Sequence, residues 1–367
     1  MTSTAPMTAI GLMSGTSMDG IDAAVVRTDG AGIVEPISNL TIPYSPEFRR
    51  ELQSVLGGGG PVDQVSETLT HSHADAVAAV LTAPALSPDD IAVIGFHGHT
   101  ILHQPENRRT WQIGDGALLA SLTAIDVVAD FRANDVAAGG EGAPLAPIFH
   151  AAVAPKDRPV CVLNIGGVAN VTWIGVAASA EDDTVFDHLL AFDTGPGNAL
   201  IDDWVAAHCG KPFDRNGAIA ASGVVETGSL ISLMEHSYFD RAPPKSLDRD
   251  SFSIAALESL SPADGAATLT AFTVAAIERA RAHFPAPPRR WIVTGGGRHN
   301  RLLMRMLGER LEAPVVSAEQ AGLEGDAMEA QAFAYMAVRS LRGLPLSGPS
   351  TTGVPQPLSG GHLFRAG

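Results

Sequence analysis

Acidic, hydroxyl and glycine residues are concentrated in one short segment near the start of the chain, residues 14–20 (SGTSMDG). A turn of this composition presents backbone N–H groups and hydroxyls to one point, as the binding of a phosphate chain requires. The carboxylates of Asp19 and Asp22 could hold a magnesium ion there, directly or through water. The same residue types also form tight hairpin turns for conformational reasons, so this segment alone leaves both interpretations open.

A second candidate is Asp193, within residues 192–198 (FDTGPGN). We expect a strand to end and a helix to begin here, which places Asp193 at the sheet edge where open α/β sheets bind ligands. A carboxylate at that edge can orient a hydroxyl or a water and accept its proton during phosphoryl transfer. The alternative is that Asp193 only caps the following helix. The neighbouring glycines favour the first interpretation, because bare backbone lets a ligand approach.

Three histidines allow a different chemistry. His97 and His99 follow an expected strand at residues 91–96, and His103 comes shortly after them. An HxH pair at a strand end can bind zinc, which would make the chain a zinc-dependent hydrolase. The sequence contains no partner cluster such as HxxEH. A polar strand end that hydrogen-bonds substrate or backbone is therefore the favoured interpretation.

Two further charged side chains stand near glycine-rich or helical segments. Arg132, beside Asp130, can clamp a substrate carboxylate through two hydrogen bonds, or it can form a structural ion pair with Asp130. Glu329 lies in the first turn of an expected helix, where its charge offsets the helix dipole. The residues by themselves favour the structural interpretation for Glu329 and leave that of Arg132 open.

Hydrophobic periodicity predicts the elements that position these residues. Apolar runs predict strands at residues 8–13, 21–26, 160–165, 168–174 and 291–294, and helical spacing predicts helices at 65–81, 198–208, 300–311 and 327–341. Two of the strand pairs share a glycine-containing turn, which indicates two related lobes. We therefore predict an α/β fold with an N-terminal lobe, residues 1–155, and a C-terminal lobe, residues 156–367, whose last helix could pack back on the N-terminal lobe.

Charge and composition exclude several classes of protein. The 367 residues include 40 Asp and Glu against 24 Lys and Arg, a net charge of -16 that repels phosphate backbones. We expect no nucleic-acid partner and no membrane partner. The two cysteines make no disulfide framework, and the first residues resemble neither a secretory signal nor a transit peptide, so we expect a soluble, cytoplasmic protein. The sequence contains neither GxxxxGK[ST] nor a helix-opening GxGxxG.

Taken in order, the motifs resemble those of the anhydro-N-acetylmuramic acid kinases from about residue 9 to about residue 342. The segments that carry the resemblance are residues 11–22, 96–101, 128–132, 135–140, 163–167, 192–198, 213–218, 244–246, 295–297 and 328–333. The resemblance implies the two-lobed, ribonuclease H-like fold of the sugar kinase, actin and heat-shock ATPase superfamily. In that fold a cleft between the lobes closes over the substrate.

The family's reaction consumes ATP, water and 1,6-anhydro-N-acetylmuramic acid and yields N-acetylmuramic acid 6-phosphate. The resemblance thus implies a cytoplasmic enzyme of peptidoglycan recycling that uses ATP and Mg²⁺ and forms a homodimer. By position, Asp193 matches the catalytic base that activates the attacking water, and His97, Arg132 and Glu329 match positions near the sugar. Asp19 and Asp22 stay the candidate magnesium ligands.

The nucleotide positions implied by the resemblance lie in three glycine-containing loops. They are Gly15, Thr16, Ser17, Met18, Asp19, Gly20, Ile21 and Asp22 in the first loop, Gly166 and Gly167 in the second, and Gly295, Gly296, Gly297 and Asn300 in the third. One departure concerns His99, which stands where members of the family usually have Gln. Because histidine titrates near neutrality, we expect the affinity for the sugar to depend on pH.

Overall fold

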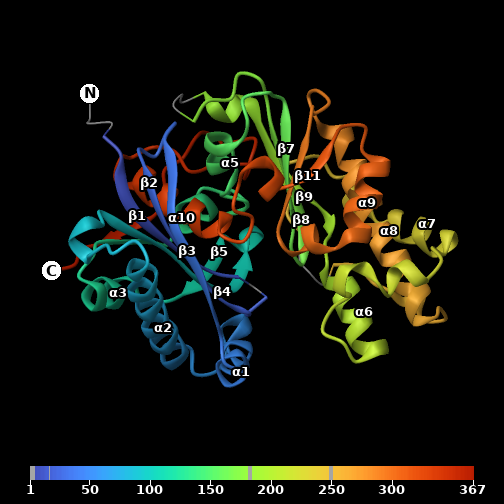
Figure 1. The fold of residues 1–367 in the computed structure, drawn as a ribbon, viewed down its shortest axis with the longest axis horizontal. Helices are drawn as coiled ribbons and strands as arrows, with labels where there is room; N and C mark the ends of the chain where they lie inside the picture. The colour runs from blue at the N-terminus through green and yellow to red at the C-terminus, as the bar shows by residue number, and fades with distance from the viewer. Residues whose placement is uncertain (1–4, 16, 181–183, 248–250) are drawn as a thin grey trace. The chain divides into compact units, whose positions relative to one another are not determined.

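The computed structural model describes residues 5–15, 17–180, 184–247 and 251–367, which form two compact units. Unit 1 comprises Met1–Val153, Ala178–Asp187 and Asp326–Gly367, and unit 2 comprises Ala154–Ala177 and His188–Gly325. Figure 1 shows the ribbon of each unit, with most of the helices and strands labelled. Each unit is built on a mixed sheet with helices packed against it, so the predicted α/β class is confirmed.

The sheet of unit 1 has the strand order β12-β6-β4-β1-β2-β3, with β5 paired to β4. β1 pairs antiparallel with β2, as β2 does with β3, whereas β1, β4 and β6 run parallel. The strands are β1 (Met7–Ser14), β2 (Gly20–Thr28), β3 (Val34–Pro43), β4 (Val93–Gln104), β5 (Arg109–Ile113), β6 (Val127–Ala129) and β12 (His362–Phe364). The helices are α1 (Pro46–Ser54), α2 (Val62–Thr82), α3 (Gly116–Thr123), α4 (Ala133–Ala137), α5 (Pro147–Val153) and α10 (Met328–Leu341).

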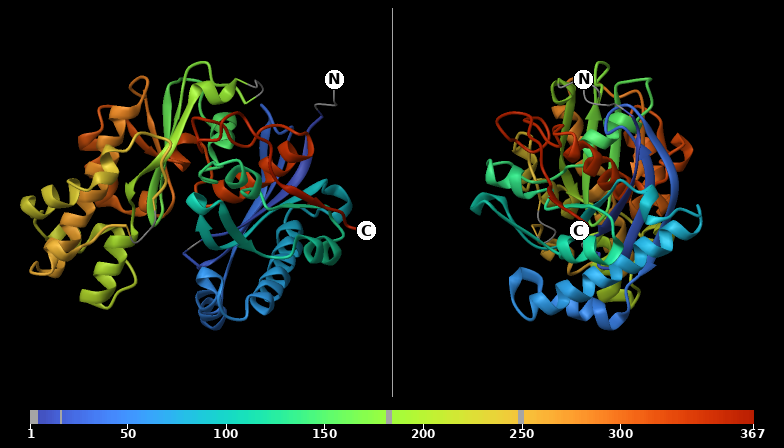
Figure 2. Two further views of the ribbon diagram at one scale, coloured as in Figure 1. Left: turned by 180° about the vertical axis from the view of Figure 1, so that it is seen from behind. Right: turned by 90° about the vertical axis from the view of Figure 1, so that its left-hand side faces the viewer.

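Helix α10 lies directly on β1 and β4 because both strands carry a glycine at the contact. A Cβ on Gly11 would lie 1.8 Å from the carbonyl oxygen of Ala330, and one on Gly95 would lie 2.1 Å from that of Phe333. The side chains of alternate strand residues, such as Ile10 and Phe96, point to the other face and pack with α2 and α3. Figure 2 (left) shows α10, in red, in front of the strands of this sheet.

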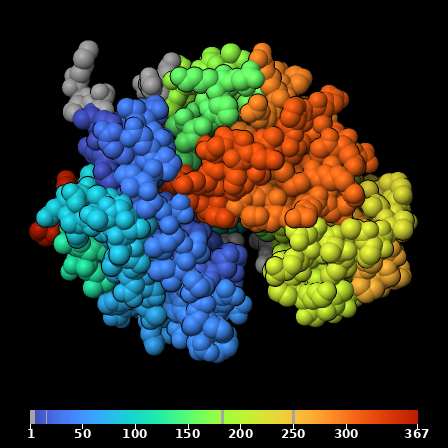
Figure 3. Space-filling model, viewed as in Figure 1, coloured from blue at the N-terminus to red at the C-terminus, as the bar shows by residue number. Residues whose placement is uncertain are grey.

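This packing corrects the predicted division of the chain. We expected residues 156–367 to form one lobe whose last helix could pack back on the N-terminal lobe. α10 does pack there, within Asp326–Gly367, but Ala178–Asp187 also belongs to unit 1. The membership of Asp326–Gly367 has a physical cause, since α10 buries nearly its whole length against the sheet of unit 1. The surface of unit 1 visible in Figure 3 is formed largely by β3, α1 and α2.

The sheet of unit 2 repeats the order of five strands of unit 1, β6-β4-β1-β2-β3. It runs β11-β10-β7-β8-β9, with β7, β8 and β9 antiparallel and β7, β10 and β11 parallel. Its strands are β7 (Val160–Ile165), β8 (Val168–Ile174), β9 (Leu189–Pro196), β10 (Trp291–Thr294) and β11 (Val315–Ser317). Its helices are α6 (Ala199–Cys209), α7 (Thr227–Met234), α8 (Pro262–Ala280) and α9 (Arg301–Arg310). The β1–β2 turn of unit 1 and the β7–β8 turn of unit 2 therefore hold corresponding places.

Most predicted elements match to within a few residues, but β4 and β9 continue past the places where we expected a strand to end. β7, β8 and β10 have the predicted bounds, and α6 ends at Gly210 in the left-handed conformation. β4 continues to Gln104 because β5 pairs with its polar second half, so His97 and His99 lie within a strand rather than at its end. β9 continues to Pro196, so Asp193 also lies inside a strand.

Within the described residues, no single helix has the length and apolar composition needed to cross a membrane. One bent pair, Arg215–Ser222 with Thr227–Met234, meets those criteria only when its two parts are taken together.

Candidate functional site

The turn between β1 and β2 is held at its end by donors from the segment after β3. The backbone N–H of Tyr44 and the guanidinium of Arg49 each donate a 3.0 Å hydrogen bond to the carbonyl oxygen of Asp19. Within the turn, the N–H of Met18 donates to the carbonyl of Gly15, and Met18 adopts a left-handed φ of 53°. The backbone is therefore fixed by contacts outside the turn. Thr16, also predicted here, lies outside the described residues.

The side chains of this turn divide into exposed and buried groups. Ser17 and Asp19 are exposed, and the hydroxyl of Ser17 donates a 2.8 Å hydrogen bond to Oδ1 of Asp19. Gly20 is required where it stands, because a Cβ there would lie 2.4 Å from the carbonyl oxygen of Ile42. The side chain of Ile21 is fully buried in the core of unit 1, so only its backbone is available to a ligand.

Carboxylates gather next to this turn. The pKa of Asp22 is raised, first by loss of hydration and then by the charges of Asp19 and Asp326, although Thr41 donates a hydrogen bond to it. The pKa of Glu329 is also raised, first by desolvation and next by Asp22. A cation bound by Asp19 and Asp22 alone would relieve the repulsion between these two carboxylates.

Arg132 is bonded to His97 rather than to Asp130. Its Nε and Nη2 lie 3.2 and 3.1 Å from Nε2 of His97, and its Nη1 donates to the carbonyl oxygen of Gly142 at 2.7 Å. Desolvation lowers the pKa of Arg132, and the charges of Glu329 and then Asp135 counteract that effect. No ion pair between Arg132 and Asp130 occurs among the described residues, so that interpretation is wrong.

His97 uses both ring nitrogens within the protein. Nε2 accepts from Arg132, so the proton is on Nδ1, which donates to the carbonyl oxygen of Gly98 at 2.9 Å. Burial, and then the charge of Arg132, hold the pKa of His97 well below its ordinary value. Neither nitrogen is left for a metal or a sugar hydroxyl. His97 therefore holds Arg132, which is also predicted to lie near the sugar.

His99 is fully buried. Its Nδ1 lies 2.9 Å from the hydroxyl of Ser14, and desolvation lowers its pKa to about 4. Its ring is thus neutral throughout the physiological range. The expected pH dependence of sugar affinity has no basis in this side chain.

In unit 2, Asp193 is half-buried on β9 and held by residues that the predictions did not assign. The N–H of Leu247 donates a 2.8 Å hydrogen bond to Oδ2 of Asp193. The backbone of Asp193 donates to the carbonyl of Lys245 and accepts from the hydroxyl of Tyr238. Asn198, not Asp193, is the N-cap residue of α6, so the capping alternative is wrong.

Lys245 places a cation next to this segment. It is buried, its ammonium lies 4.6 Å from the ring centre of Tyr238, and it donates to that residue's carbonyl oxygen. Desolvation, followed by the charges of Arg241 and Arg279, lowers the pKa of Lys245 to about 8. The sequence alone does not identify Tyr238 or Lys245 as site residues, because an isolated tyrosine and a lysine after two prolines match no catalytic or binding motif. The resemblance of residues 244–246 to the family was the one signal in this region.

The second and third glycine loops meet at Asn198. The N–H groups of Gly197 and Asn198 donate to the carbonyls of Gly167 and Gly166, at 2.9 and 2.7 Å. A Cβ on Gly297 would lie 2.5 Å from Ile165, which immediately precedes Gly166. The structure therefore brings Gly166 and Gly167 together with the loop Gly295, Gly296 and Gly297.

Asn300 has a structural role at the end of the third loop. Its side chain accepts a 3.1 Å hydrogen bond from the N–H of Leu303 and caps α9. Its Oδ1 is thereby committed to the helix.

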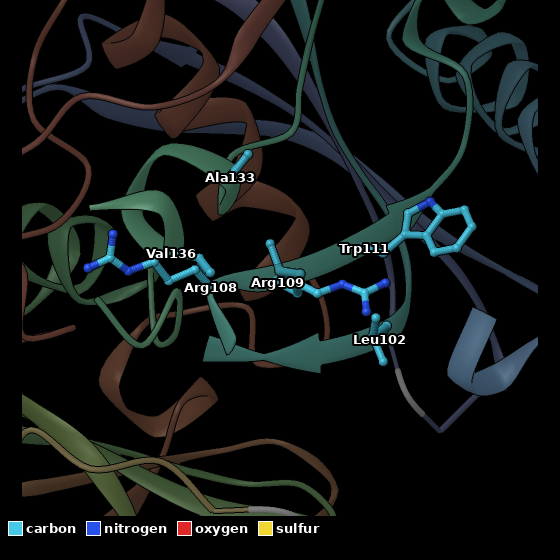
Figure 4. Close-up of a pocket in the computed structure, with 7 residues that line it drawn as sticks. Leu102, Arg108, Arg109, Trp111, Ala133 and Val136 are labelled. Carbon is cyan, nitrogen blue, oxygen red and sulfur yellow. The ribbon is translucent and has the colours of Figure 1, made fainter. Parts of the chain in front are cut away.

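A hollow of about 290 Å³ lies elsewhere in unit 1, between β5 and α4. Figure 4 shows that the side chains of Arg108 and Arg109 point away from each other at its wall. None of the predicted site residues lines it, although Ala133 directly follows Arg132. We assign the hollow no role in the chemistry.

Comparison with known proteins distinguishes a kinase from a zinc-dependent hydrolase. The chain matches the family model described as anhydro-N-acetylmuramic acid kinase over residues 7–366. It is 53% identical over 360 residues to the anhydro-N-acetylmuramic acid kinase of Paramagnetospirillum magneticum, covering 97% of this chain and 99% of that protein. The protein of the same name from Acidiphilium cryptum is 52% identical over 372 residues, covering 98% and 99%. This chain belongs to the anhydro-N-acetylmuramic acid kinase family.

Solved structures of sugar kinases match this member of the anhydro-N-acetylmuramic acid kinase family at low sequence identity and low TM-score. A ROK family glucokinase from Streptomyces griseus is 14% identical, with a TM-score of 0.42, and covers 90% of this chain and 99% of its own. A xylulose kinase from Lactobacillus acidophilus is 11% identical, with a TM-score of 0.47, and covers 98% and 94%. These identities and TM-scores are too low to assign roles to individual residues.

Membership of this kinase family leaves the zinc-hydrolase alternative unsupported. Within the described part of the chain, no group of three or more His, Cys, Asp and Glu side chains could hold a metal ion. The geometry gives the reason at His97, where the guanidinium of Arg132 occupies the nitrogen that a metal would need.

Proposed function

We propose that this enzyme uses ATP to convert 1,6-anhydro-N-acetylmuramic acid into N-acetylmuramic acid 6-phosphate. The observation that carries the proposal is the family match over residues 7–366, together with about 50% identity to relatives named for this activity. A half-buried carboxylate at Asp193, held by a backbone donor, is the chemical group that such a reaction needs.

Asp193 is proposed as the general base. The hydrogen bond from Leu247 fixes Oδ2, so the carboxylate can accept a proton from water at a defined orientation. The oxygen of that water bonds to C1 of the sugar while the bond from C1 to O6 breaks. O6 takes the bond to the γ-phosphorus, ADP leaves, and the proton of the water passes to Asp193. One carboxylate thus serves both the ring opening and the phosphoryl transfer.

The β1–β2 turn is proposed to bind the phosphates. Its backbone is fixed by Tyr44 and Arg49, so its N–H groups are arranged before a ligand arrives. The donor set of Asp19 and Asp22 fits Mg²⁺, a hard cation that prefers carboxylate oxygens. When bound, that ion neutralises charge on the phosphates. The loops at Gly166 and Gly295 in unit 2 are proposed to contact the rest of the nucleotide.

Arg132 and Glu329 are proposed to contact the sugar, and His97 to position Arg132. The electrostatic coupling of Arg132 to Glu329 supports this grouping. We also propose that the enzyme is cytoplasmic and forms a homodimer, as the family resemblance suggests. Sedimentation of the purified protein over a range of concentrations tests the second of these proposals.

Coupled measurement of ADP release tests the activity itself. We expect turnover with the intact 1,6-anhydro sugar and none with N-acetylmuramic acid, because the latter has no anhydro bond to open. In ¹⁸O-labelled water the product should carry the label at C1. Equal rates with both sugars, or a product without the label, would contradict the proposal.

A further inference from the structure

Tyr44 bonds to both ends of the β1–β2 turn. Its backbone N–H donates to the carbonyl oxygen of Asp19 at 3.0 Å, and its phenol donates to the hydroxyl of Ser14 at 2.8 Å. Ser14 ends β1 and Asp19 immediately precedes β2, so the two bonds bracket the turn. Tyr44 is buried and edge-packed on Phe48, at 5.0 Å between ring centres, which fixes the position of its hydroxyl.

The hydrogen bond of Tyr44 to Ser14 continues to His99. The Ser14 hydroxyl accepts from Tyr44, and it is only 1% exposed, so its own proton needs a buried acceptor. Nδ1 of His99, at 2.9 Å, is the acceptor in place. An accepting Nδ1 puts the proton of the neutral ring on Nε2. Nε2 of His99 is therefore a buried donor, and it has no partner among the described residues.

His73, on α2, presents the complementary group. Its Nδ1 lies 2.8 Å from the carbonyl oxygen of Leu69, so Nδ1 carries the proton and Nε2 is an acceptor. That Nε2 is also buried without a partner among the described residues. The ring of His73 lies 4.9 Å from Phe96 of β4, the strand that carries His99. Desolvation, and to a smaller extent the interaction with His99, lowers the pKa of His73, whereas the bond to Leu69 raises it.

We propose that Tyr44, Ser14, His99 and His73 form one hydrogen-bond relay, closed by a buried water between the two histidine Nε2 atoms, that positions the β1–β2 turn for nucleotide binding. Each donor of the four side chains then has an acceptor: Tyr44 donates to Ser14, Ser14 to His99, His99 to the water, and His73 to the carbonyl of Leu69, while the water donates to Nε2 of His73. Tyr44 and His99 act through the turn, so they are positioning residues. The nucleotide part of this inference rests on the proposed function, whereas the relay itself does not.

Tyr44→Phe tests the link to the turn, and Tyr335→Phe is its matched control. Tyr335 is likewise buried in unit 1, and its hydroxyl likewise bonds, to the carbonyl of Ala31. We expect faster amide hydrogen exchange in residues 14–22 of Tyr44→Phe only. We also expect about fivefold weaker ATP binding in calorimetry, the equivalent of one lost hydrogen bond. Affinity for the sugar should stay unchanged in both variants.

The role of His99 in the relay is tested by replacing it with a residue that can make the same two hydrogen bonds. Gln can accept at Oε1 and donate at Nε2, so His99→Gln should keep the exchange rate of the turn and the affinity for ATP. His99→Leu removes both functions and should behave like Tyr44→Phe. In ¹⁵N spectra of histidine-labelled wild-type protein, His99 should show the Nε2–H tautomer and His73 the Nδ1–H tautomer. A crystal structure should show the bridging water.

The outcomes separate the relay from the proposed function. If Tyr44→Phe and Tyr335→Phe lose stability equally and turn exchange changes in neither, the positioning role is wrong. An Nδ1–H tautomer at His99 overturns the direction of the relay. If wild-type protein binds no ATP, the proposed function fails, yet the exchange and tautomer results still decide the relay.

Discussion

The N–H of Leu247 donates a 2.8 Å hydrogen bond to Oδ2 of Asp193, which leaves the carboxylate in one orientation on β9. Asn at position 193 can accept the same bond through its Oδ1, but it cannot take a proton from water. Asp193→Asn should therefore lower kcat at least about 100-fold, the usual scale of a lost general base, while ATP affinity and Tm hold. ADP release and calorimetry measure the two effects.

The control for this substitution is Asp187→Asn, because Asp187 is an acidic residue of unit 1 that lies outside the proposed site. It should leave turnover unchanged. Loss of ATP binding together with the fold in Asp193→Asn would assign Asp193 a structural role instead.

Arg132→Lys tests the guanidinium that joins His97 to Gly142. Lys has one nitrogen and cannot contact both Nε2 of His97 and the carbonyl of Gly142. We expect a rise in the KM for the sugar of about tenfold or more, and a loss of about 1–3 kcal/mol of unfolding free energy from the unsatisfied buried group. Steady-state kinetics and denaturant unfolding measure these effects.

Arg27→Lys is the control for that substitution, because Arg27 forms an exposed ion pair with Glu35. It should change the unfolding free energy by less than about 0.5 kcal/mol. A normal KM in Arg132→Lys would remove Arg132 from the sugar site.

The contrast between predicted and missed residues has a physical basis. Turns rich in glycine, such as Gly166–Gly167, and alternating apolar runs, such as β7, carry their own local signal in the sequence. The hydrogen bonds from Tyr44 to Ser14 and from Leu247 to Asp193 join residues far apart in the chain, and no local pattern encodes them.

The same reasoning explains the wrong expectation for His99. Its neighbours in sequence suggested a polar strand end, but pairing of β4 with β5 and the packing of α2 bury it. Burial is a tertiary property, and it lowers the pKa that the sequence alone would set near 6.5.

Gly11 allows α10 to contact β1 because it has no Cβ. Gly308 is a suitable control, because the space around it is open. A Cβ at Gly11 would lie 1.8 Å from a helix carbonyl, whereas nothing lies within 4 Å of one at Gly308, inside α9. Gly11→Ala should cost about 3 kcal/mol or more through overpacking. Gly308→Ala should add about 0.5–1 kcal/mol, since alanine favours helix. Denaturant unfolding tests both, and a neutral Gly11→Ala would contradict the close packing.

The buried histidines predict how stability depends on pH. Burial lowers the pKa of His73, His99 and His150 to about 4, below the ordinary value of 6.5. Between those values the unfolded chain binds more protons than the folded one, so the free energy of unfolding should rise with pH from about 4 to about 6.5. Above 6.5 these groups are neutral in both states and contribute no further slope.

His99→Gln isolates one of these groups. It removes one titrating site, so the rise in unfolding free energy between pH 4.5 and pH 6.5, measured by urea unfolding, should be smaller than in the wild type. Between pH 5.5 and pH 8, the two proteins should show the same pH dependence of sugar affinity in calorimetry, because the His99 ring is already neutral there. A step in affinity near pH 6.5 that disappears in His99→Gln would show that His99 titrates in the folded protein and is not buried as described.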